Sequence, residues 1–503
     1  MSEKSLKFIN NHLVLVLTGV FLFRTGYLFV SDLDLIGDES YYWDWSRRPD
    51  WCYYSKPPMV AWLIAVFTGL GGDTTAVVRL PAVVLGTVFL GYFYATARAF
   101  YSAQTAALAL LLMLSMPFNV LANFVMTIDP PLYCFWMMSL YYLHRALFKD
   151  SQSAWFWAGL STGTALLSKQ VAVLIPIMLI CFLLLDRQRY RLFKREFCIY
   201  LLPVIVCLIP LLIWNYQHDW VMFGHSKGHF GIKQAVAVST RLKDAGTFWL
   251  YQLLLATPVI FVLVLILSVK SSLRLKRLLP AEQFLMLMGP VLLLGILALS
   301  FLQKVQGNWP VPFYFSALIL LSGQWQVDPW RKPLKSGLLL GGLMVSLTYV
   351  LPLLVQTFNW HHSMVDPTSR FRHWRELAQS IDDERHKNLT VPEQAFIMVV
   401  GHRNIASQLG FYLQDHPTVF RYEVSGLVES QYELWPGPVE HIGQTGFIIS
   451  EQKEADIPVA LKSAFEKFHQ VGEVINPMKK NARYNLFLGE NLLFWPPINS
   501  INK

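Results

Sequence analysis

The residues best suited to chemistry lie in a short segment rich in acids and aromatic rings, residues 35–58. Aspartate is favoured at helix N-caps, so a helix could begin at Asp38. Tyr41, Tyr42 and Trp45 would then lie on the same face of that helix as Asp38. A carboxylate that aromatic rings partly shield from water suits a general base. An aromatic belt at a membrane surface with a capping aspartate would give the same pattern, so both interpretations stay open.

Two further charges of this segment are Glu39 and Lys56. Glu39 is adjacent to the first acid and would point away from it, so we do not expect the two acids to act as a pair. Lys56 precedes Pro57 and Pro58, which hold the backbone extended. An ammonium presented in this way is a natural phosphate ligand, although a lysine reaching toward lipid phosphates would look the same.

Three more basic residues stand at predicted outer ends of apolar stretches. They are Arg79, Lys169 and Lys304. Each could contact a lipid-linked phosphate or diphosphate. Each could equally extend to the membrane surface without a specific ligand, as charges near the ends of membrane helices commonly do.

Polar residues also open two of the apolar stretches. Asp129 precedes two prolines, and Asn308 and Trp309 precede another proline. An acid at a helix start satisfies free N–H groups, and an asparagine followed by a tryptophan can serve as a cap and an interfacial anchor. A ligand site and simple helix capping are both compatible with these positions.

The segment 214–220 combines hydrogen-bonding side chains with aromatic rings, a mixture that sugars often bind, and His225 follows it. His225 and His229 are four residues apart and could ligate a metal, but no third ligand has suitable spacing. We therefore expect no cofactor, and a divalent metal is possible but unsupported.

The chain as a whole has the composition of a membrane protein. Of its 503 residues, 54% are hydrophobic and only 15% are charged. The apolar residues form runs long enough to cross a bilayer. We expect about eleven spans, with boundaries near 11–30, 77–97, 105–124, 130–147, 153–168, 170–185, 197–215, 247–268, 281–301, 308–323 and 336–357.

The basic residues indicate an orientation for these spans. They gather in short loops on one side, so the positive-inside rule predicts a cytoplasmic N-terminus and an outside C-terminus. This distribution also argues against nucleic acid as the partner of the +9 net charge. The fold class expected is a polytopic α-helical membrane domain, residues 1–357, with a long outside loop at 31–76. A soluble α/β domain, residues 358–503, is expected to follow.

Short apolar runs in the C-terminal part predict strands at 395–400, 418–420 and 446–450. Helical periodicity predicts helices at 404–414 and 459–468. The five cysteines are an odd number without metal-type spacing, so we expect neither a disulfide framework nor a structural zinc site.

Several ordered strings of residues resemble one family. They are GDESYYWDWS (37–46) with the downstream KPP (56–58), TIDPPL (127–132), GLSTGTALLSK (159–169), WNYQHDW (214–220) and QGNWPVPFY (306–314). Together they resemble the bacterial members of the dolichyl-phosphate-mannose-protein mannosyltransferase-like superfamily, including the lipid A aminoarabinose transferases and related lipopolysaccharide glycosyltransferases. The resemblance covers residues 10–325, and more loosely SQYELWP (430–436).

This resemblance implies a C-type glycosyltransferase fold in a bacterial inner membrane, with its C-terminal domain in the periplasm. The implied donor is a polyprenyl-phosphate sugar, and the acceptor is lipid A, another lipid or an envelope glycan. Asp38 takes the position of the essential carboxylate and Lys56 that of a lysine contacting the donor phosphate. The remaining phosphate candidates are Lys169, Arg79 and Lys304, and the sugar or acceptor candidates are Glu39, Tyr42, Tyr54, Asp129, His225, Asn308 and Trp309.

Two other functions remain to be distinguished from a transferase. A transporter or flippase of a lipid-linked glycan would carry charges inside its spans and often shows internal repeats, and this sequence has few such charges and no detectable repeat. An oligosaccharide ligase or polymerase would differ in using glycans as both donor and acceptor.

Overall fold

The computed structural model describes residues 3–186, 189, 192–193, 195–230, 237–360, 366, 368–477 and 482–496. Contacts within the chain divide it into two units. Unit 1 comprises residues 1–30, 79–213 and 228–353, and unit 2 comprises 31–78, 214–227 and 354–503. The expected division fell at residue 357 alone, whereas the contacts group residues 31–78 and 214–227 with the C-terminal part.

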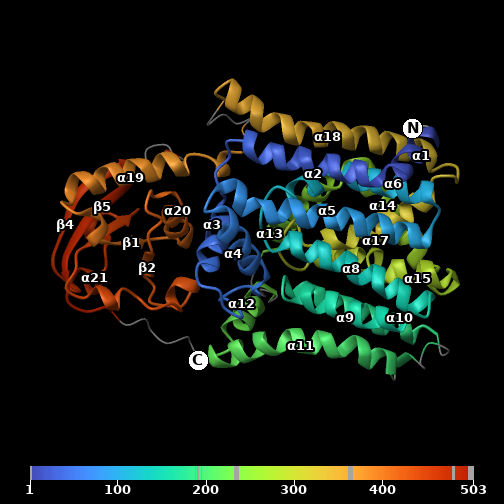
Figure 1. Cartoon of the computed structure of the whole chain (residues 1–503), viewed down its shortest axis with the longest axis horizontal. Coiled ribbons are helices and arrows are strands. Elements are labelled where there is room, and N and C mark those ends of the chain that lie inside the picture. The colour runs from blue at the N-terminus through green and yellow to red at the C-terminus, as the bar shows by residue number, and fades with distance from the viewer. Residues whose placement is uncertain are drawn as a thin grey trace. The chain divides into compact units, whose positions relative to one another are not determined.

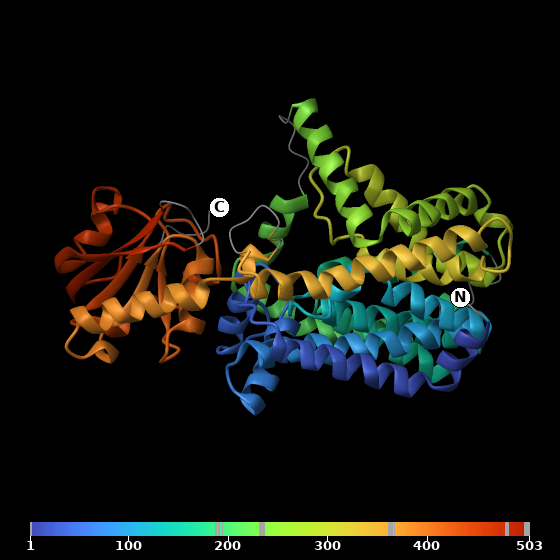
Figure 2. The same cartoon turned by 90° about the horizontal axis from the view of Figure 1, so that it is seen from above.

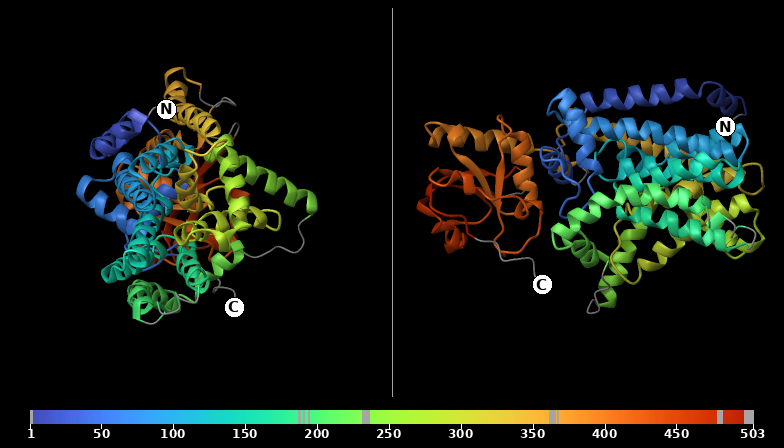
Figure 3. Two further views of the ribbon diagram at one scale, coloured as in Figure 1. Left: turned by 90° about the vertical axis from the view of Figure 1, so that its right-hand side faces the viewer. Right: turned by 60° about the horizontal axis from the view of Figure 1, so that its bottom comes forward.

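Unit 1 is helical. Its helices run largely side by side (Figure 1) and are seen nearly end-on in Figure 3, left. They are α1 (Glu3–Asn11), α2 (Leu13–Val30), α5 (Thr75–Phe100), α6 (Ala103–Leu114), α7 (Pro117–Leu121), α8 (Asp129–Phe148), α9 (Gln152–Leu166), α10 (Leu174–Leu184), α11 (Arg195–Gln217), α13 (Val238–Leu255), α14 (Pro258–Ser272), α15 (Pro280–Leu287), α16 (Pro290–Leu299), α17 (Val311–Gly323) and α18 (Arg331–Thr357). Short 3-10 turns, η1 (Gln170–Val173) and η3 (Leu275–Arg277), join some of them.

Length and hydropathy support membrane spans for only some of these helices. Among the described residues, five helices are long and apolar enough to cross a bilayer, or six if a bent pair counts as one span. Four shorter apolar helices are not included in this count. The chain is therefore a membrane protein with several spans, and the expected number of eleven remains a prediction.

The span expected at 247–268 is wrong as a single straight helix. Helices α13 and α14 meet at an angle of 108°, and α13 stands steeply against its neighbours in Figure 2. Thr257 lies at the break with a φ of 61°, and its side chain accepts a hydrogen bond from the Ile260 backbone N–H. Pro258 then starts α14, because proline fits the first turn of a helix but cannot continue the preceding one.

The span expected at 105–124 is also interrupted. Helix α6 ends at Leu114, and a separate short helix, α7, begins at Pro117. The residue before a proline is disfavoured in helical geometry, which explains why the apolar run does not form one continuous helix.

The C-terminal part of unit 2 contains a five-stranded sheet with the order β2-β1-β3-β5-β4. The strands are β1 (Phe396–Val400), β2 (Val419–Tyr422), β3 (Gly446–Ser450), β4 (Phe465–Ile475) and β5 (Arg483–Leu492). The first three run parallel to one another, and β5 is antiparallel to both β3 and β4. The register pairs Met398 with Ile448 and Ile448 with Phe487 across the centre of the sheet.

Helices complete unit 2. They are α3 (Gly37–Ser46), α4 (Met59–Gly71), α12 (Val221–Phe230), α19 (Trp374–Asn388), α20 (Arg403–Tyr412) and α21 (Val459–Lys462), with 3-10 turns η4 (Ser369–Phe371), η5 (Pro392–Gln394), η6 (Gln431–Glu433), η7 (Val439–His441) and η8 (Glu454–Asp456). Leu461 of α21 packs with Phe396 and Met398 in one apolar cluster of the sheet.

Strands β1 to β3 and helix α20 occupy the segments predicted for them. The helix expected at 459–468 is wrong, because it ends at Lys462 and β4 starts at Phe465. Pairing of β4 with the long strand β5 outweighs the local helical spacing of the apolar residues there.

Candidate functional site

Helix α3 carries the principal candidate, Asp38, but Asp38 does not cap this helix. The N-cap is Ile36, and a side-chain oxygen of Glu39 accepts a hydrogen bond from the Ile36 backbone N–H at 3.1 Å. The prediction that Asp38 caps this helix is therefore wrong. An acid at the third helical position can reach back to the free N–H groups, and Glu39 occupies that position.

Asp38 is the exposed acid of this helix. The eight residues that follow it, from Glu39 to Ser46, are all buried. About half of the Asp38 side chain (51%) is accessible, and its nearest cationic atom is a guanidinium nitrogen of Arg403 on α20 at 3.8 Å. The expected shielding by aromatic rings is thus not seen, but a rigid, fully packed helix does hold this carboxylate.

The aromatic residues of α3 pack against one another and against Tyr53. Tyr42 and Trp45 are buried, and their ring centroids lie 5.0 Å apart. Trp45 also stacks on Tyr53 at 4.4 Å and 9° between the ring planes. These stacked rings join α3 to the turn that precedes α4.

Lys56 lies in that turn and is partly buried. Its carbonyl oxygen accepts a hydrogen bond from the Tyr53 backbone N–H at 3.2 Å. Pro57 and Pro58 follow and are both buried, as expected for a rigid lead into the next helix. The backbone that carries Lys56 is therefore well fixed.

The segment after α11 packs on the same turn. The indole N–H of Trp214 donates to a carboxylate oxygen of Asp50 at 2.7 Å, and the ring of His218 stacks on Trp214 at 3.9 Å. Two of the predicted sugar or acceptor residues, Tyr54 and His225, lie with ring centroids 4.9 Å apart. Unit 2 therefore brings together the first loop and residues 214–227, which are far apart in sequence.

The predicted histidine pair gives no support for a metal site. Among the residues that the structure describes, no group of three or more His, Cys, Asp or Glu side chains is placed to hold a metal ion. The side chain of His229 lies outside the described part of the structure.

Unit 1 contains a second polar cluster, formed by three of the predicted residues. Lys169 donates to one carboxylate oxygen of Asp129 at 2.7 Å, and the side-chain amide of Asn308 donates to the other at 2.6 Å. The Asp129 and Lys169 side chains are only 12% and 13% exposed. Three segments, at the start of α8, after α9 and before α17, therefore meet at one carboxylate.

Sequence analysis identified each of these three residues as a separate site candidate, but it did not predict that they contact one another. They are 40 and 179 residues apart, and nothing local in the sequence encodes such a pairing. The Asp129 carboxylate holds the Lys169 ammonium in place, and an ammonium has three N–H donors, of which this contact uses one.

The remaining candidates in unit 1 have different surroundings. Arg79 is buried, with its guanidinium carbon 4.6 Å from the centre of the Phe124 ring. Lys304 is exposed. Trp309 is partly buried against the apolar core of the helices.

The chain is similar to several known proteins. Residues 55–214 match the protein family described as dolichyl-phosphate-mannose-protein mannosyltransferase. This range includes Lys56, Arg79, Asp129 and Lys169 but not Asp38. A lipid A galacturonosyltransferase, RgtD, from Rhizobium johnstonii is 26% identical over 424 residues, which cover 84% of this chain and 86% of that protein.

Two solved structures share the fold. ArnT from Cupriavidus metallidurans bound to undecaprenyl phosphate matches with a TM-score of 0.61 at 16% identity, covering 94% of this chain and 98% of that one. The same protein in the apo state matches with a TM-score of 0.52 at 17% identity, covering 95% and 98%.

These matches confirm the resemblance predicted from the sequence strings, which is to the C-type glycosyltransferase superfamily. They also confirm the predicted enzyme class, a glycosyltransferase.

Proposed function

We propose that this protein transfers a sugar from a polyprenyl-phosphate donor to lipid A or another lipid or glycan of the bacterial envelope. The proposal extends to its location. The helical part, residues 1–357, lies in the inner membrane with the N-terminus in the cytoplasm, and the C-terminal part lies in the periplasm. The match to a lipid A galacturonosyltransferase over 84% of the chain supports this substrate class.

The observation that carries the proposal is the exposed carboxylate of Asp38 on an otherwise buried helix. An inverting transfer needs a base that accepts the proton of the acceptor hydroxyl while its oxygen attacks the anomeric carbon of the sugar. A carboxylate that is accessible to substrate and fixed by a packed helix suits this role. The same negative charge also stabilises the positive charge that develops on the sugar ring.

The departing group is the polyprenyl phosphate, which leaves readily when cations neutralise its charge. Lys56 and Lys169 are proposed as its principal ligands, with Arg79 and Lys304 as further cations. The bond between the anomeric carbon and the phosphate oxygen breaks as the bond to the acceptor oxygen forms. The proton of the acceptor passes to Asp38, so no covalent enzyme intermediate is required.

The sugar and the acceptor would be held by groups that combine hydrogen bonding with ring stacking. The candidates are Glu39, Tyr42, Tyr54, Asp129, His225, Asn308 and Trp309. Tyr54 and His225 form one such contact within unit 2. Glu39 already caps α3, and Asp129 already holds Lys169, so these two acids would act through the residues they fix.

The direct test is the mass profile of lipid A and lipopolysaccharide from cells carrying the wild type, Asp38→Asn or no copy of the gene. Asp32→Asn is a matched control, because Asp32 is an exposed acid of the same loop that pairs with an arginine, Arg375, at 2.8 Å. The proposal predicts that one sugar mass disappears with Asp38→Asn and with the deletion, and persists with the control. Identical profiles in all four strains, with the Asp38 variant present in the membrane, would refute lipid A as the acceptor.

A further inference from the structure

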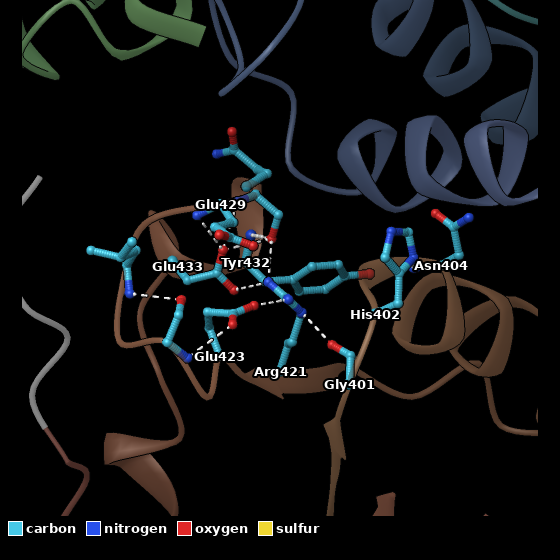
Figure 4. A network of polar contacts seen from close by, with 12 residues as sticks. Gly401, His402, Asn404, Arg421, Glu423, Glu429, Tyr432 and Glu433 are labelled. Carbon is cyan, nitrogen blue, oxygen red and sulfur yellow. Dashed lines mark hydrogen bonds and ion pairs between the residues drawn. The ribbon is translucent and has the colours of Figure 1, made fainter. Parts of the chain in front are cut away.

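A turn of the C-terminal part, residues 430–433, is held by a buried arginine. Arg421 on β2 donates to a Glu433 carboxylate oxygen at 2.6 Å, to the Ser430 hydroxyl at 3.3 Å and to the Gly401 carbonyl at 2.7 Å (Figure 4). It also forms an ion pair with Glu423. The guanidinium therefore links the turn to β2 and to the residue that follows β1.

Glu433 closes the same turn from the other side. Its second oxygen accepts hydrogen bonds from the Ser430 backbone N–H at 2.6 Å and from the Ser430 hydroxyl at 2.8 Å. It accepts a third from the Glu429 backbone N–H at 3.2 Å. Burial raises the pKa of Glu433 above its usual value, against the opposing effects of Arg421 and Ser430. A carboxylate with this many donors and a buried cation leaves the turn little freedom to move.

The two residues at the centre of this turn reach the first outside loop. The Gln431 side-chain oxygen accepts a hydrogen bond from the Tyr54 backbone N–H at 2.7 Å, and the Gln431 backbone N–H donates to the Tyr41 hydroxyl at 2.6 Å. The Tyr432 hydroxyl donates to Asp44 at 2.6 Å. Because all three contacts are buried, water does not replace them easily.

These contacts lie close in sequence to the proposed base, Asp38, and to the proposed phosphate ligand, Lys56. Tyr41 is three residues after Asp38, one helical turn along α3, and Tyr54 is two residues before Lys56. A displacement of α3 or of the turn at 53–56 would therefore move the proposed base or the proposed phosphate ligand directly. Small displacements of reacting groups are known to reduce rates strongly.

We propose that Gln431 and Tyr432 are positioning residues, which hold Asp38 and Lys56 in their reactive geometry from the C-terminal part of unit 2. Arg421 and Glu433 act one step further away by fixing the turn that carries them. This assigns the C-terminal part a role in the chemistry of the first loop in addition to any role in acceptor binding. The inference rests on the proposed function of Asp38 and Lys56.

The test compares variants of the purified full-length protein. Gln431→Leu removes the oxygen acceptor at similar size, Gln431→Glu retains it, and Tyr432→Phe removes the hydroxyl that Asp44 accepts from. Tyr484→Phe is the matched control, because Tyr484 is a buried tyrosine on β5 outside this turn. Transfer rates at saturating and limiting undecaprenyl-phosphate sugar separate kcat from KM.

Gln431→Leu should lower kcat at least ten-fold and raise KM for the lipid donor, because it loosens the backbone before Lys56. Gln431→Glu should restore only part of both, because its carboxylate would be buried two residues from Glu433. Tyr432→Phe should lower kcat with little change in KM, because Asp44 lies on the helix that carries the proposed base. The control should match the wild type in both constants.

Hydrogen exchange measured by mass spectrometry on the same samples does not depend on activity. The expected result is faster exchange limited to residues 38–56 in Gln431→Leu and Tyr432→Phe. Unchanged exchange and rates in both variants would overturn the inference, and so would faster exchange spread evenly over unit 2, because that result indicates only lost stability. A wild-type protein without transfer activity would refute the proposed function, while the exchange data would still decide whether this turn orders the first loop.

Discussion

Asp38 in unit 2 and Asp129 in unit 1 are acids at the starts of two helices, but their charges are balanced very differently. Asp38 is half exposed, and its nearest cationic atom is 3.8 Å away. Asp129 is largely buried and accepts hydrogen bonds from Lys169 and Asn308 at 2.7 and 2.6 Å. A carboxylate so fully satisfied fixes its neighbours, whereas an exposed one remains available to a substrate. Sequence position at a helix start therefore does not determine which role an acid takes.

The largest effect is expected from Asp38→Asn, which keeps the size of the side chain and removes its basicity. If Asp38 is the base, kcat should fall by about 10²–10⁴-fold, the usual contribution of general acid–base catalysis. Thermal stability should stay close to that of the wild type, because the side chain is exposed. Transfer assays and melting curves on the purified protein check both parts. A loss of less than three-fold would show that Asp38 only positions substrate or has no role.

Asp129→Asn tests the other side of the comparison. It leaves the Lys169 ammonium poorly compensated in a largely buried position, so unfolding should become easier by about 1–3 kcal/mol, and activity should fall as well. Asp129→Asn combined with Lys169→Met should recover part of the stability but not the activity. If the double variant recovers both, Lys169 is a structural partner of Asp129 and does not bind the donor.

Asp44 provides a third case on the same helix as Asp38. Burial raises the pKa of Asp44, against the opposing effects of the Tyr432 hydroxyl and of Arg47 and Arg48. A carboxyl with a raised pKa in the folded state stabilises the fold below its unfolded pKa of about 3.9, and this contribution is lost as pH rises through the folded pKa.

Asp44→Asn should therefore remove this pH dependence while the amide oxygen still accepts from Tyr432. We expect the variant to be as stable as the wild type at neutral pH, or more stable by about 1 kcal/mol. Melting temperatures of both proteins between pH 4 and pH 8 give the measurement. A clear destabilisation of the variant at neutral pH would mean that Asp44 is ionised and that its charge is required.

The smallest effect is expected from Arg403→Gln. This guanidinium is partly buried and lies 3.8 Å from a half-exposed carboxylate, so water screens the pair in part, and exposed ion pairs contribute about 0.2–1 kcal/mol. The transfer rate should change by less than about five-fold, and the change should shrink as salt is added. A much larger effect would show that Arg403 contacts the substrate rather than tuning Asp38.

The first loop is the part of the candidate site most readily identified from sequence, because its acid, aromatic rings and Lys-Pro-Pro string lie within a few turns of one another. Local patterns identified the segment but assigned the capping role to the wrong acid, since Asp38 and Glu39 are adjacent and only the fold shows which one turns back toward Ile36.

The contacts between distant segments could not be predicted in this way. The pairing of Lys169 with Asp129 and the contacts of Gln431 with the first loop join residues that are 40 and 377 or more apart. No local signal in the sequence links such residues. The same limit explains the span at 247–268, where hydropathy registers an apolar run and does not register the change of direction at Thr257 and Pro258.

The edges of the C-terminal sheet affect whether copies of this protein can pair with one another. Strand β4 forms one edge and exposes Glu466, Lys467 and Glu473, and its ladder is irregular between Gln470 and Gly472. The opposite edge, β2, is only four residues long. Charges, a bulge and a short strand each discourage another chain from adding to a sheet. Copies of this part can therefore lie close to one another without joining through their strands into aggregates.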